Sequence, residues 1–453
     1  MACPMLRLIT FICIILAQLL TTCMAAVTWK TTFSPTNLDM KMHSYEHVNF
    51  TIENLIPEEQ GLLDISVHCD NELVAEIDDD SRKLIQIENN GMYNGAFNVS
   101  AIFLGSTEIY IEVKSSKTNS TEKSSEKLPV IVTREVRIID HIFTGSVATL
   151  VSILYINFGA ALDLPTVKQI LVRPIGPILA FIAQFGFMPL CAYGLGHLLF
   201  PTYPELALGL FFTGVSPAGG ASNIWSVILN GNVNLSIAMT TISTFAAFAM
   251  MPAWIFSLGK NVFDRANLVV PYRQIGTFAI GLVIPLGIGI LIQKYCPRVK
   301  TFLVRILKPV STLLILFIVI FAIVTNLYLF ELFSWEIIVA GLGLPWLGYM
   351  FGFVIAILLR QPLYDALTIG IETGIQNTGI AIFLLRFSLP QPAADLTTVV
   401  PVSVAIMTPI PLLMIYIYQK LHQRLCVPES ERKMIKDSST YNGFSSTNEE
   451  PAA

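Results

Sequence analysis

Charged residues are scarce in this sequence. Asp, Glu, Lys and Arg account for 13% of its 453 residues, whereas a soluble domain typically carries about 25%. That shortage argues against an ordinary cytosolic enzyme. The formal net charge of −4 at pH 7 excludes a basic nucleic-acid-binding protein, because such a protein needs an excess of Lys and Arg to contact phosphates.

Cysteines are also few and scattered. Three of the seven fall within the first 25 residues, and Cys69 is the only one between residues 26 and 137. That region therefore cannot contain an internal disulfide. Cys191, Cys296 and Cys426 lack the spacing of metal ligands. We expect no transition-metal site and, because no nucleophile–base constellation is present, no enzyme.

The charge that is present divides the chain into two parts. Residues 26–137 hold 18 acids and 10 bases in 112 residues, a fraction of 25%. Residues 138–420 hold only 9 acids and 13 bases in 283 residues. The first part has the composition of a soluble domain, and the second has that of a membrane domain.

The N-terminus is typical of a secretory signal peptide. Arg7 precedes an uninterrupted apolar run from Leu8 to Leu20, and the small residues Ala25 and Ala26 follow. A signal anchor is the alternative, but a run of 13 residues is too short to span a bilayer comfortably. We predict cleavage of residues 1–25, which places residues 26–137 outside the cell or in a lumen.

Residues 26–137 are predicted to form a small β-sandwich-like extracellular domain. Short segments alternate between apolar and polar residues, which is typical of half-buried strands. The turn formers Asn94-Gly95 are expected to separate two of them, and the polar, Ser- and Lys-rich stretch 115–127 is expected to be a linker. The predicted strands are 48–52, 63–67, 96–104, 107–113 and 129–133.

Three N-glycosylation sequons agree with an extracellular location. They begin at Asn49, Asn98 and Asn119, all within the predicted luminal domain. One such match is weak, but three behind a signal peptide are stronger. A fourth sequon at Asn234 lies in apolar surroundings, so we do not expect its modification.

From residue 138 onward we predict an all-α, polytopic membrane domain. Each apolar span is long enough to cross a bilayer about 30 Å thick. Ten Lys and Arg residues fall in the predicted inside segments and four in the outside ones, which supports a cytoplasmic C-terminus. Residues 421–453 are expected to form a disordered cytoplasmic tail. The nine spans are 138–161, 174–199, 204–229, 234–258, 272–293, 302–329, 335–359, 363–388 and 397–419.

Two of the nine spans contain helix-breaking, polar sequences. Residues 216–223 read SPAGGASN, and residues 372–379 read ETGIQNTG. Non-helical backbone within a bilayer must be buried in protein or line a cavity. The breaks are five spans apart, so the two helices run in opposite directions, as inverted repeats with two broken crossover helices would require. Such paired breaks indicate the binding site of a secondary transporter, whereas kinked structural helices are the alternative.

Glu372 is the acid that most needs an explanation. A carboxylate near mid-membrane is costly, and no Lys or Arg lies mid-span to neutralise it. A bound cation explains it, and a protonated structural Glu is the alternative. With hard oxygens, one carboxylate and no His or Cys nearby, Na⁺ is favoured over Ca²⁺ or a transition metal. The oxygen-bearing residues are Ser222, Asn223, Ser236, Thr240, Thr241 and Gln376.

Four blocks of these residues resemble the bile acid:sodium symporter family. The blocks are GVSPAGGASN at 214–223, GNVNLSIAMTTIST at 231–244, ETGIQN at 372–377 and QFGFMP at 184–189. The resemblance covers about residues 138–420. The domain ahead of it departs from the bile-acid-carrying members, whose N-termini are short, and is more like the subgroup that contains the P3 protein.

The resemblance implies two sodium sites beside the crossing of the broken helices. The first set is Ser222, Asn223, Ser236, Thr240 and Glu372. The second set is Gln184, Glu372 and Gln376, with the backbone carbonyls of Thr373 and Ile375. Asn377 would face the substrate cavity, where helix N-termini favour an anionic head group.

We therefore expect a multi-pass protein of the plasma membrane or an endomembrane that couples Na⁺ to the symport of an amphipathic organic anion. The family substrates, bile acids and sulfated steroids, combine an apolar ring system with an anion. We expect no cofactor other than Na⁺ as the coupling ion. A non-transporting membrane receptor with a ligand-binding ectodomain is the alternative.

Overall fold

The computed structural model describes residues 29–53, 62–78, 83–86, 92–115, 121–135, 137–161, 175–325 and 334–426. Its internal contacts divide the chain into two units, Met1–Val136 and Arg137–Ala453. The predicted signal peptide, the sequon at Asn119 and most of the predicted tail lie outside the described residues.

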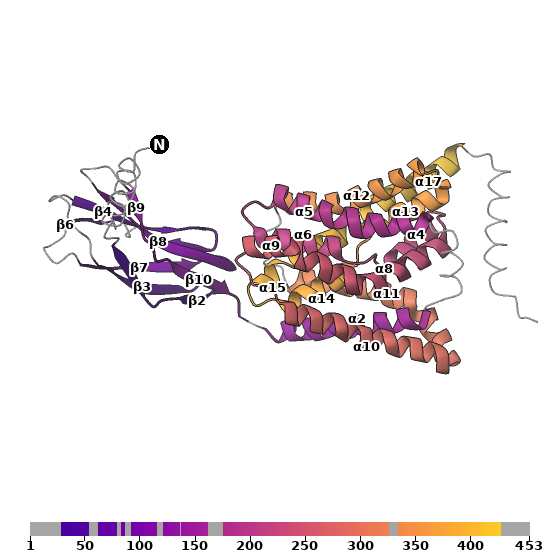
Figure 1. Ribbon diagram of the computed structural model, residues 1–453, viewed down its shortest axis with the longest axis horizontal. Helices are drawn as coiled ribbons and strands as arrows, with labels where there is room; N and C mark the ends of the chain where they lie inside the picture. Colours follow the sequence, from indigo (N-terminus) through magenta and orange to yellow (C-terminus); the bar gives the residue numbers. More distant parts are fainter. Residues whose placement is uncertain are drawn as a thin grey trace, which may run out of the picture. The chain divides into compact units, whose positions relative to one another are not determined.

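The N-terminal unit consists of two β-sheets (Figure 1). Neighbouring strands are antiparallel, except that β2 and β10 run parallel. The first sheet has the order β1 (Lys30–Ser34), β3 (Tyr45–Glu53), β7 (Tyr93–Ala101), β5 (Ala75–Ile77). The second has the order β2 (Leu38–Lys41), β10 (Leu128–Thr133), β8 (Gly105–Ser115), β4 (Leu62–Cys69), β6 (Lys83–Gln86), and β9 (Thr121–Lys123) pairs with β8.

Both sheets contribute alternate residues to one apolar core. Val48, Phe50 and Ile52 of β3 belong to the same buried cluster as Ile109 and Ile111 of β8. Because successive side chains of a strand point to opposite faces, this burial produces the period-2 pattern of the sequence. The segments 48–52, 63–67, 107–113 and 129–133 are confirmed as parts of β3, β4, β8 and β10. The predicted strand 96–104 is confirmed only to Ala101, where β7 ends.

Two predictions for this unit are wrong. Asn94-Gly95 is not a turn but lies inside β7, where Gly95 pairs with Phe50 of β3. A Cβ atom on Gly95 would lie 2.3 Å from the Phe50 ring, so glycine is needed here for packing. The predicted linker 115–127 contains strand β9, whose three residues are all exposed. An all-exposed strand has no apolar alternation by which sequence could reveal it.

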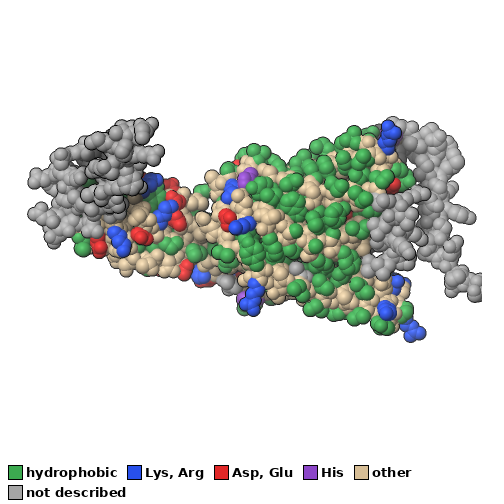
Figure 2. Space-filling model, in the orientation of Figure 1, with side chains coloured by type: hydrophobic (Ala, Val, Ile, Leu, Met, Phe, Trp, Pro, Cys, Tyr) green, Lys and Arg blue, Asp and Glu red, His purple; other side chains and the backbone are tan. Residues whose placement is uncertain are grey.

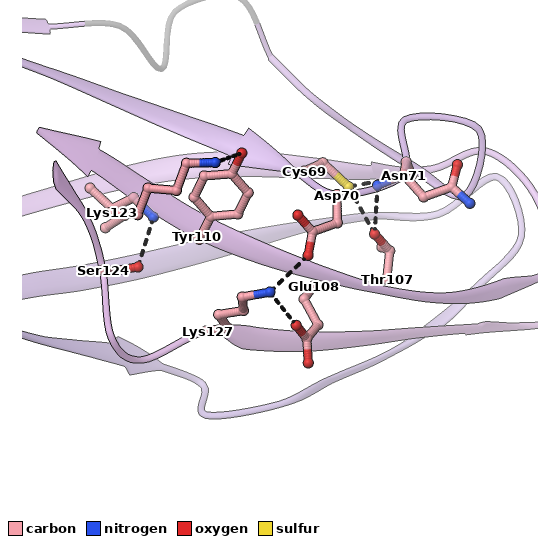
Figure 3. Close-up of polar contacts among 10 residues, drawn as sticks. Cys69, Asp70, Asn71, Thr107, Glu108, Tyr110, Lys123, Ser124 and Lys127 are labelled. Carbon is pink, nitrogen blue, oxygen red and sulfur yellow. Dashed lines mark hydrogen bonds and ion pairs between the residues drawn. The ribbon is translucent and has the colours of Figure 1, made fainter. Parts of the chain in front are cut away.

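Polar contacts join strands and loops of the second sheet (Figure 3). Lys127 Nζ donates to Glu108 Oε2 at 2.7 Å and to Asp70 Oδ2 at 3.0 Å, and these hydrogen bonds raise the pKa of its ammonium group. Cys69 is half-buried and unpaired, and its Sγ lies 3.3 Å from Thr107 Oγ1. Burial raises the pKa of the Cys69 thiol, so it stays protonated at neutral pH.

The second unit is a helical bundle (Figure 1). Its first half contains α2 (Ile138–Ala161), α4 (Ile175–Ile182), the π-helix η2 (Ala183–Phe187), α5 (Met188–Leu199), α6 (Pro204–Val215), α7 (Ala221–Ile228), α8 (Val233–Phe256) and α9 (Leu258–Arg265). Its second half contains α10 (Tyr272–Tyr295), α11 (Pro297–Thr325), α12 (Trp335–Leu358), α13 (Leu363–Gly374), α14 (Thr378–Ser388), α15 (Ala393–Leu396), α16 (Val399–Met407) and α17 (Pro409–Cys426).

Six helical segments of the described chain are long and apolar enough to cross a membrane. Hydrophobic side chains cover most of the visible face of this unit, and charged side chains lie near its ends (Figure 2). Nine crossings, inverted repeats and a cytoplasmic C-terminus remain predictions. The six segments are Asp140–Ala160, Ile175–Leu199, Val233–Phe256, Tyr272–Tyr295, Trp335–Leu358 and Ala393–His422.

Two sequons lie on neighbouring strands, where Asn49 of β3 and Asn98 of β7 are both exposed. We predict that Asn49→Gln and Asn98→Gln each remove one glycan from protein made in a eukaryotic secretory pathway. Gel mobility before and after treatment with an N-glycosidase measures this. Asn94→Gln, a change in the same strand outside any sequon, should leave the mobility unchanged. An absence of any glycosidase-sensitive shift in surface-exposed protein would contradict the extracellular assignment.

Candidate functional site

The two predicted helix breaks pair with each other through their backbones. One break separates α6 from α7, and the other separates α13 from α14. Gly219 N donates to Ile375 O at 2.8 Å, and Asn377 N donates to Pro217 O at 2.8 Å. Ala218 and Gln376, which lie between these two bonds, form an isolated antiparallel bridge. Backbone groups freed from the helices thus find partners away from lipid, as a membrane interior requires.

Local sequence explains why the crossing forms at these residues. Pro217 has no backbone N–H and cannot continue a helical ladder. A Cβ atom on Gly219 would lie 2.8 Å from Gln376 O, so only glycine allows the two chains to approach this closely. Ser243 Oγ accepts from Ala218 N at 3.2 Å, which secures the crossing to α8.

The side chains of the first predicted sodium set come together from α7, α8 and α13. Ser236 Oγ contacts both Glu372 Oε1 and Asn223 Oδ1, the latter at 2.8 Å. Thr240 Oγ1 lies 2.9 Å from Glu372 Oε2 and 3.3 Å from Ser222 Oγ. Spacing places Ser236 and Thr240 on one face of α8, which explains how two hydroxyls reach the same carboxylate.

Glu372 is buried without a fixed cationic partner. Its side chain is 2% exposed, and no ion pair to it is found among the described residues. The buried acid Asp395 differs, because Arg386 pairs with it. An unpaired buried carboxylate costs several kcal/mol or more, so Glu372 needs a proton or a cation.

Hydrogen bonding alone does not satisfy the oxygens around Glu372. A hydroxyl has one proton to donate, yet Ser236 Oγ lies within reach of two acceptors, Glu372 and Asn223. Thr240 Oγ1 lies within reach of both Glu372 oxygens and of Ser236 O. A group with more oxygen acceptors than protons is suited to a hard cation.

The second predicted sodium set adjoins the crossing. Gln184, in the π-helical turn η2, donates from Nε2 to Gln376 Oε1 and to Ser216 O, both at 2.7 Å. Gln376 Nε2 donates to Thr373 O at 2.7 Å, and Ile375 O accepts from Gly219 N. Here amide hydrogens occupy several of the predicted ligand oxygens. Gln184, Glu372 and Thr373 all line one small cavity.

Asn377 lines a second, larger cavity. Its Oδ1 accepts from Ile380 N at 3.3 Å and so caps α14. The first residues of α7 and α14 line the same cavity, and none of the described residues that line it is charged. Helix N-termini carry partial positive charge, so this neutral cavity suits a ligand with an anionic group.

Sequence analysis did not predict two hydroxyl groups of the site, those of Ser226 and Ser243. One hydroxyl that it did name, that of Thr241, lies outside the site. Ser226 is fully buried and contacts Ser236 Oγ at 3.2 Å; its position one turn after Ser222 was the available signal. Ser243, one turn after Thr240, supports the crossing. Thr241 instead donates to Ile237 O of its own helix at 2.8 Å.

Comparisons with known proteins identify a family for this chain. A family model described as the Sodium Bile acid symporter family matches residues 148–331. The ileal sodium/bile acid cotransporter of Cricetulus griseus is 32% identical over 254 residues, which cover 56% of this chain and 72% of that protein. This chain belongs to the sodium/bile acid symporter family. It is accordingly a multi-pass membrane protein of a transporter family, with an additional β-rich unit at its N-terminus.

Other relatives differ in name and length. The human P3 protein is 30% identical over 260 residues, 57% of this chain, and the match spans about half, 54%, of that protein. A sodium-dependent organic anion transporter of Rattus norvegicus is 32% identical over 251 residues, 54% of this chain and 66% of that protein. A solved structure of WR4, a C. elegans MSP family member, covers 23% of this chain and 97% of its own at 10% identity, but its TM-score of 0.17 supports no conclusion.

The close approach at Gly219 makes a testable prediction. Gly219→Ala should lower the stability of the purified protein by about 1–3 kcal/mol, because the added methyl group overpacks against the Gln376 backbone. The thermal unfolding midpoint in detergent measures this loss. Gly194→Ala in α5 is the matched control, since a Cβ atom there meets nothing within 4 Å. Equal midpoints for both variants would show that the backbones do not approach as described.

Proposed function

We propose that this chain is a sodium-coupled symporter that carries an amphipathic organic anion by alternating access. The observation that carries the proposal is Glu372, a buried carboxylate of α13 surrounded by oxygens from α7 and α8 and lacking a fixed cationic partner among the described residues. The family and the names of its relatives support sodium as the coupling ion.

The ligand chemistry favours Na⁺ over other cations. Glu372 is the single acid of the cluster, and its neighbours are hydroxyl and amide oxygens. Ca²⁺ usually collects more carboxylates, and transition metals prefer His and Cys. One negative charge inside a membrane protein is best neutralised by one positive charge, so a monovalent hard ion fits.

The same short segment connects the ion cluster to the anion cavity. The Glu372 carboxylate lies in the cluster, whereas Gln376 and Asn377, four and five residues later, line the larger cavity. Neutralising Glu372 would hold α7, α8 and α13 together and thereby order the crossing that forms one wall of that cavity. By linkage, bound anion would tighten Na⁺ binding by the same factor.

The cavity suits an anion with an apolar body. Leu154, Trp225 and Pro409 supply apolar surface, while Asn377 and Thr408 supply polar groups. Relatives are named for bile acid and organic anion transport, and we place the substrate of this chain in the class of bile acids and sulfated steroids. One group of helices would rotate relative to the remaining helices around the crossing, so that the cavity opens to each side of the membrane in turn.

The proposal predicts the effect of removing the charge of Glu372. Cells expressing Glu372→Gln should lose the Na⁺-dependent uptake of labelled taurocholate and steroid sulfates, because the cluster no longer attracts a cation. Uptake in sodium medium minus uptake in choline medium measures this. Glu336→Gln, which changes an acid in the first turn of α12, should leave uptake unchanged.

Two outcomes would contradict the proposal in different ways. Equal Na⁺-dependent uptake by wild type and Glu372→Gln would remove Glu372 from the ion site. An absence of uptake across a broad panel of organic anions, with surface expression confirmed, would favour the receptor alternative, in which the β-rich unit binds the ligand.

A further inference from the structure

The residue that precedes α8 is hydrogen-bonded to side chains in the first two turns of α13. Asn232 Nδ2 donates to Asp365 Oδ1 at 2.7 Å, and Asn232 N donates to Thr368 Oγ1 at 2.7 Å. The neighbouring glycine permits this approach, because a Cβ atom on Gly231 would lie 2.6 Å from Thr368 Oγ1. We call these two hydrogen bonds, from the Asn232 side chain to Asp365 and from the Asn232 backbone N–H to Thr368, the latch.

The latch and the Glu372 cluster both lie where α8 contacts α13. Asn232, Ser236 and Thr240 are spaced by four residues and share one face of the N-terminal half of α8. Asp365 and Glu372 are seven residues, or two turns, apart on α13. The latch therefore joins the two helices about 10 Å along α13 from Glu372, at a rise of 1.5 Å per residue.

Asn232 performs two tasks with one amide group. Its Oδ1 accepts from Leu235 N at 3.1 Å and so caps the N-terminus of α8, while its Nδ2 donates to Asp365. A hydrogen bond to a carboxylate is about twice as strong as a neutral one. Asp365 thus orients the capping amide and determines where the first turns of α8 lie relative to α13.

We propose that Asp365 and Asn232 are positioning residues that set the sodium affinity of the Glu372 cluster. The proposal rests on the sodium-coupled function above and deepens it. Among the described residues, neither the Asn232 nor the Asp365 side chain is hydrogen-bonded to Glu372. They act on Glu372 by determining where Ser236 and Thr240 lie. Ligands must be held within about 0.5 Å of their productive positions, and loss of an outer partner commonly costs a metal site about 10–100-fold in affinity.

Sodium-dependent thermal stabilisation of the purified full chain tests the latch without needing a substrate. A ligand that binds only the native state stabilises it by RT ln(1 + c/Kd), where c is the free ligand concentration, so a fit of the unfolding midpoint against ligand concentration returns Kd, the half-saturating concentration. Titrating NaCl against choline chloride at constant ionic strength yields the half-saturating sodium concentration. Asp365→Ala should raise that concentration about tenfold, the lower end of the cost of losing an outer partner.

Exchanging the amide and the carboxylate between positions 232 and 365 distinguishes the effect of losing the latch from the effect of losing the helix cap. Asn232→Asp retains a good capping residue but sets two carboxylates against each other, so it should raise the half-saturating concentration as much as Asp365→Ala. Combining Asn232→Asp with Asp365→Asn restores one donor and one acceptor and should return the value to within about threefold of wild type. Glu336→Gln should not shift it.

The outcomes distinguish this proposal from the proposed function. Latch variants that lower the midpoint in sodium-free buffer but keep the wild-type sodium titration would show a purely structural role and overturn the proposal. A wild-type sodium response that Glu372→Gln abolishes and the latch variants leave intact would overturn the latch alone. No sodium response in the wild type would overturn both proposals.

Discussion

The helical unit depends on one constraint, which is that backbone polar groups inside a membrane must find partners within the protein. Two helices stop in mid-span, and their free groups are paired only because the two breaks cross. The bonds from Gly219 to Ile375 and from Asn377 to Pro217 make each break depend on the other. Glu372, Gln376 and Asn377, which lie at or next to the second break, are placed by that mutual dependence.

The crossing also explains why the proposed ion site and the proposed anion site would lie so close together. Residues 372–377 begin in the oxygen cluster and end in the larger cavity, so one short segment contributes to both. A cation that orders α7, α8 and α13 orders this segment too. Coupling then needs no long-range path, because the shared element is itself the connection between the two sites.

Sequence patterns predicted those parts of the molecule whose burial is periodic or whose chemistry is unusual. Alternation revealed β3, β4, β7, β8 and β10. It was overlooked in the short strands β1 and β2, which add Phe33, Leu38 and Met40 to the core, and it is absent from the fully exposed strand β9. It also failed at Gly95, because the reason for glycine there is the Phe50 ring of a neighbouring strand. Such a contact joins residues far apart in sequence, so no local pattern records it.

By itself, the sequence predicted the division into two units, the two helix breaks and the burial of one conspicuous acid, Glu372. Charge scarcity makes an intramembrane acid conspicuous, and the clustered Pro, Gly and polar residues of 216–223 indicate a break, whereas a single proline such as Pro252 lies inside a continuous helix. Only the tertiary structure decided that Ser226 belongs to the site and Thr241 does not, and that Asn232 meets Asp365. Which face of one helix meets which face of another depends on packing between distant segments, and helical spacing specifies the faces but not their partners.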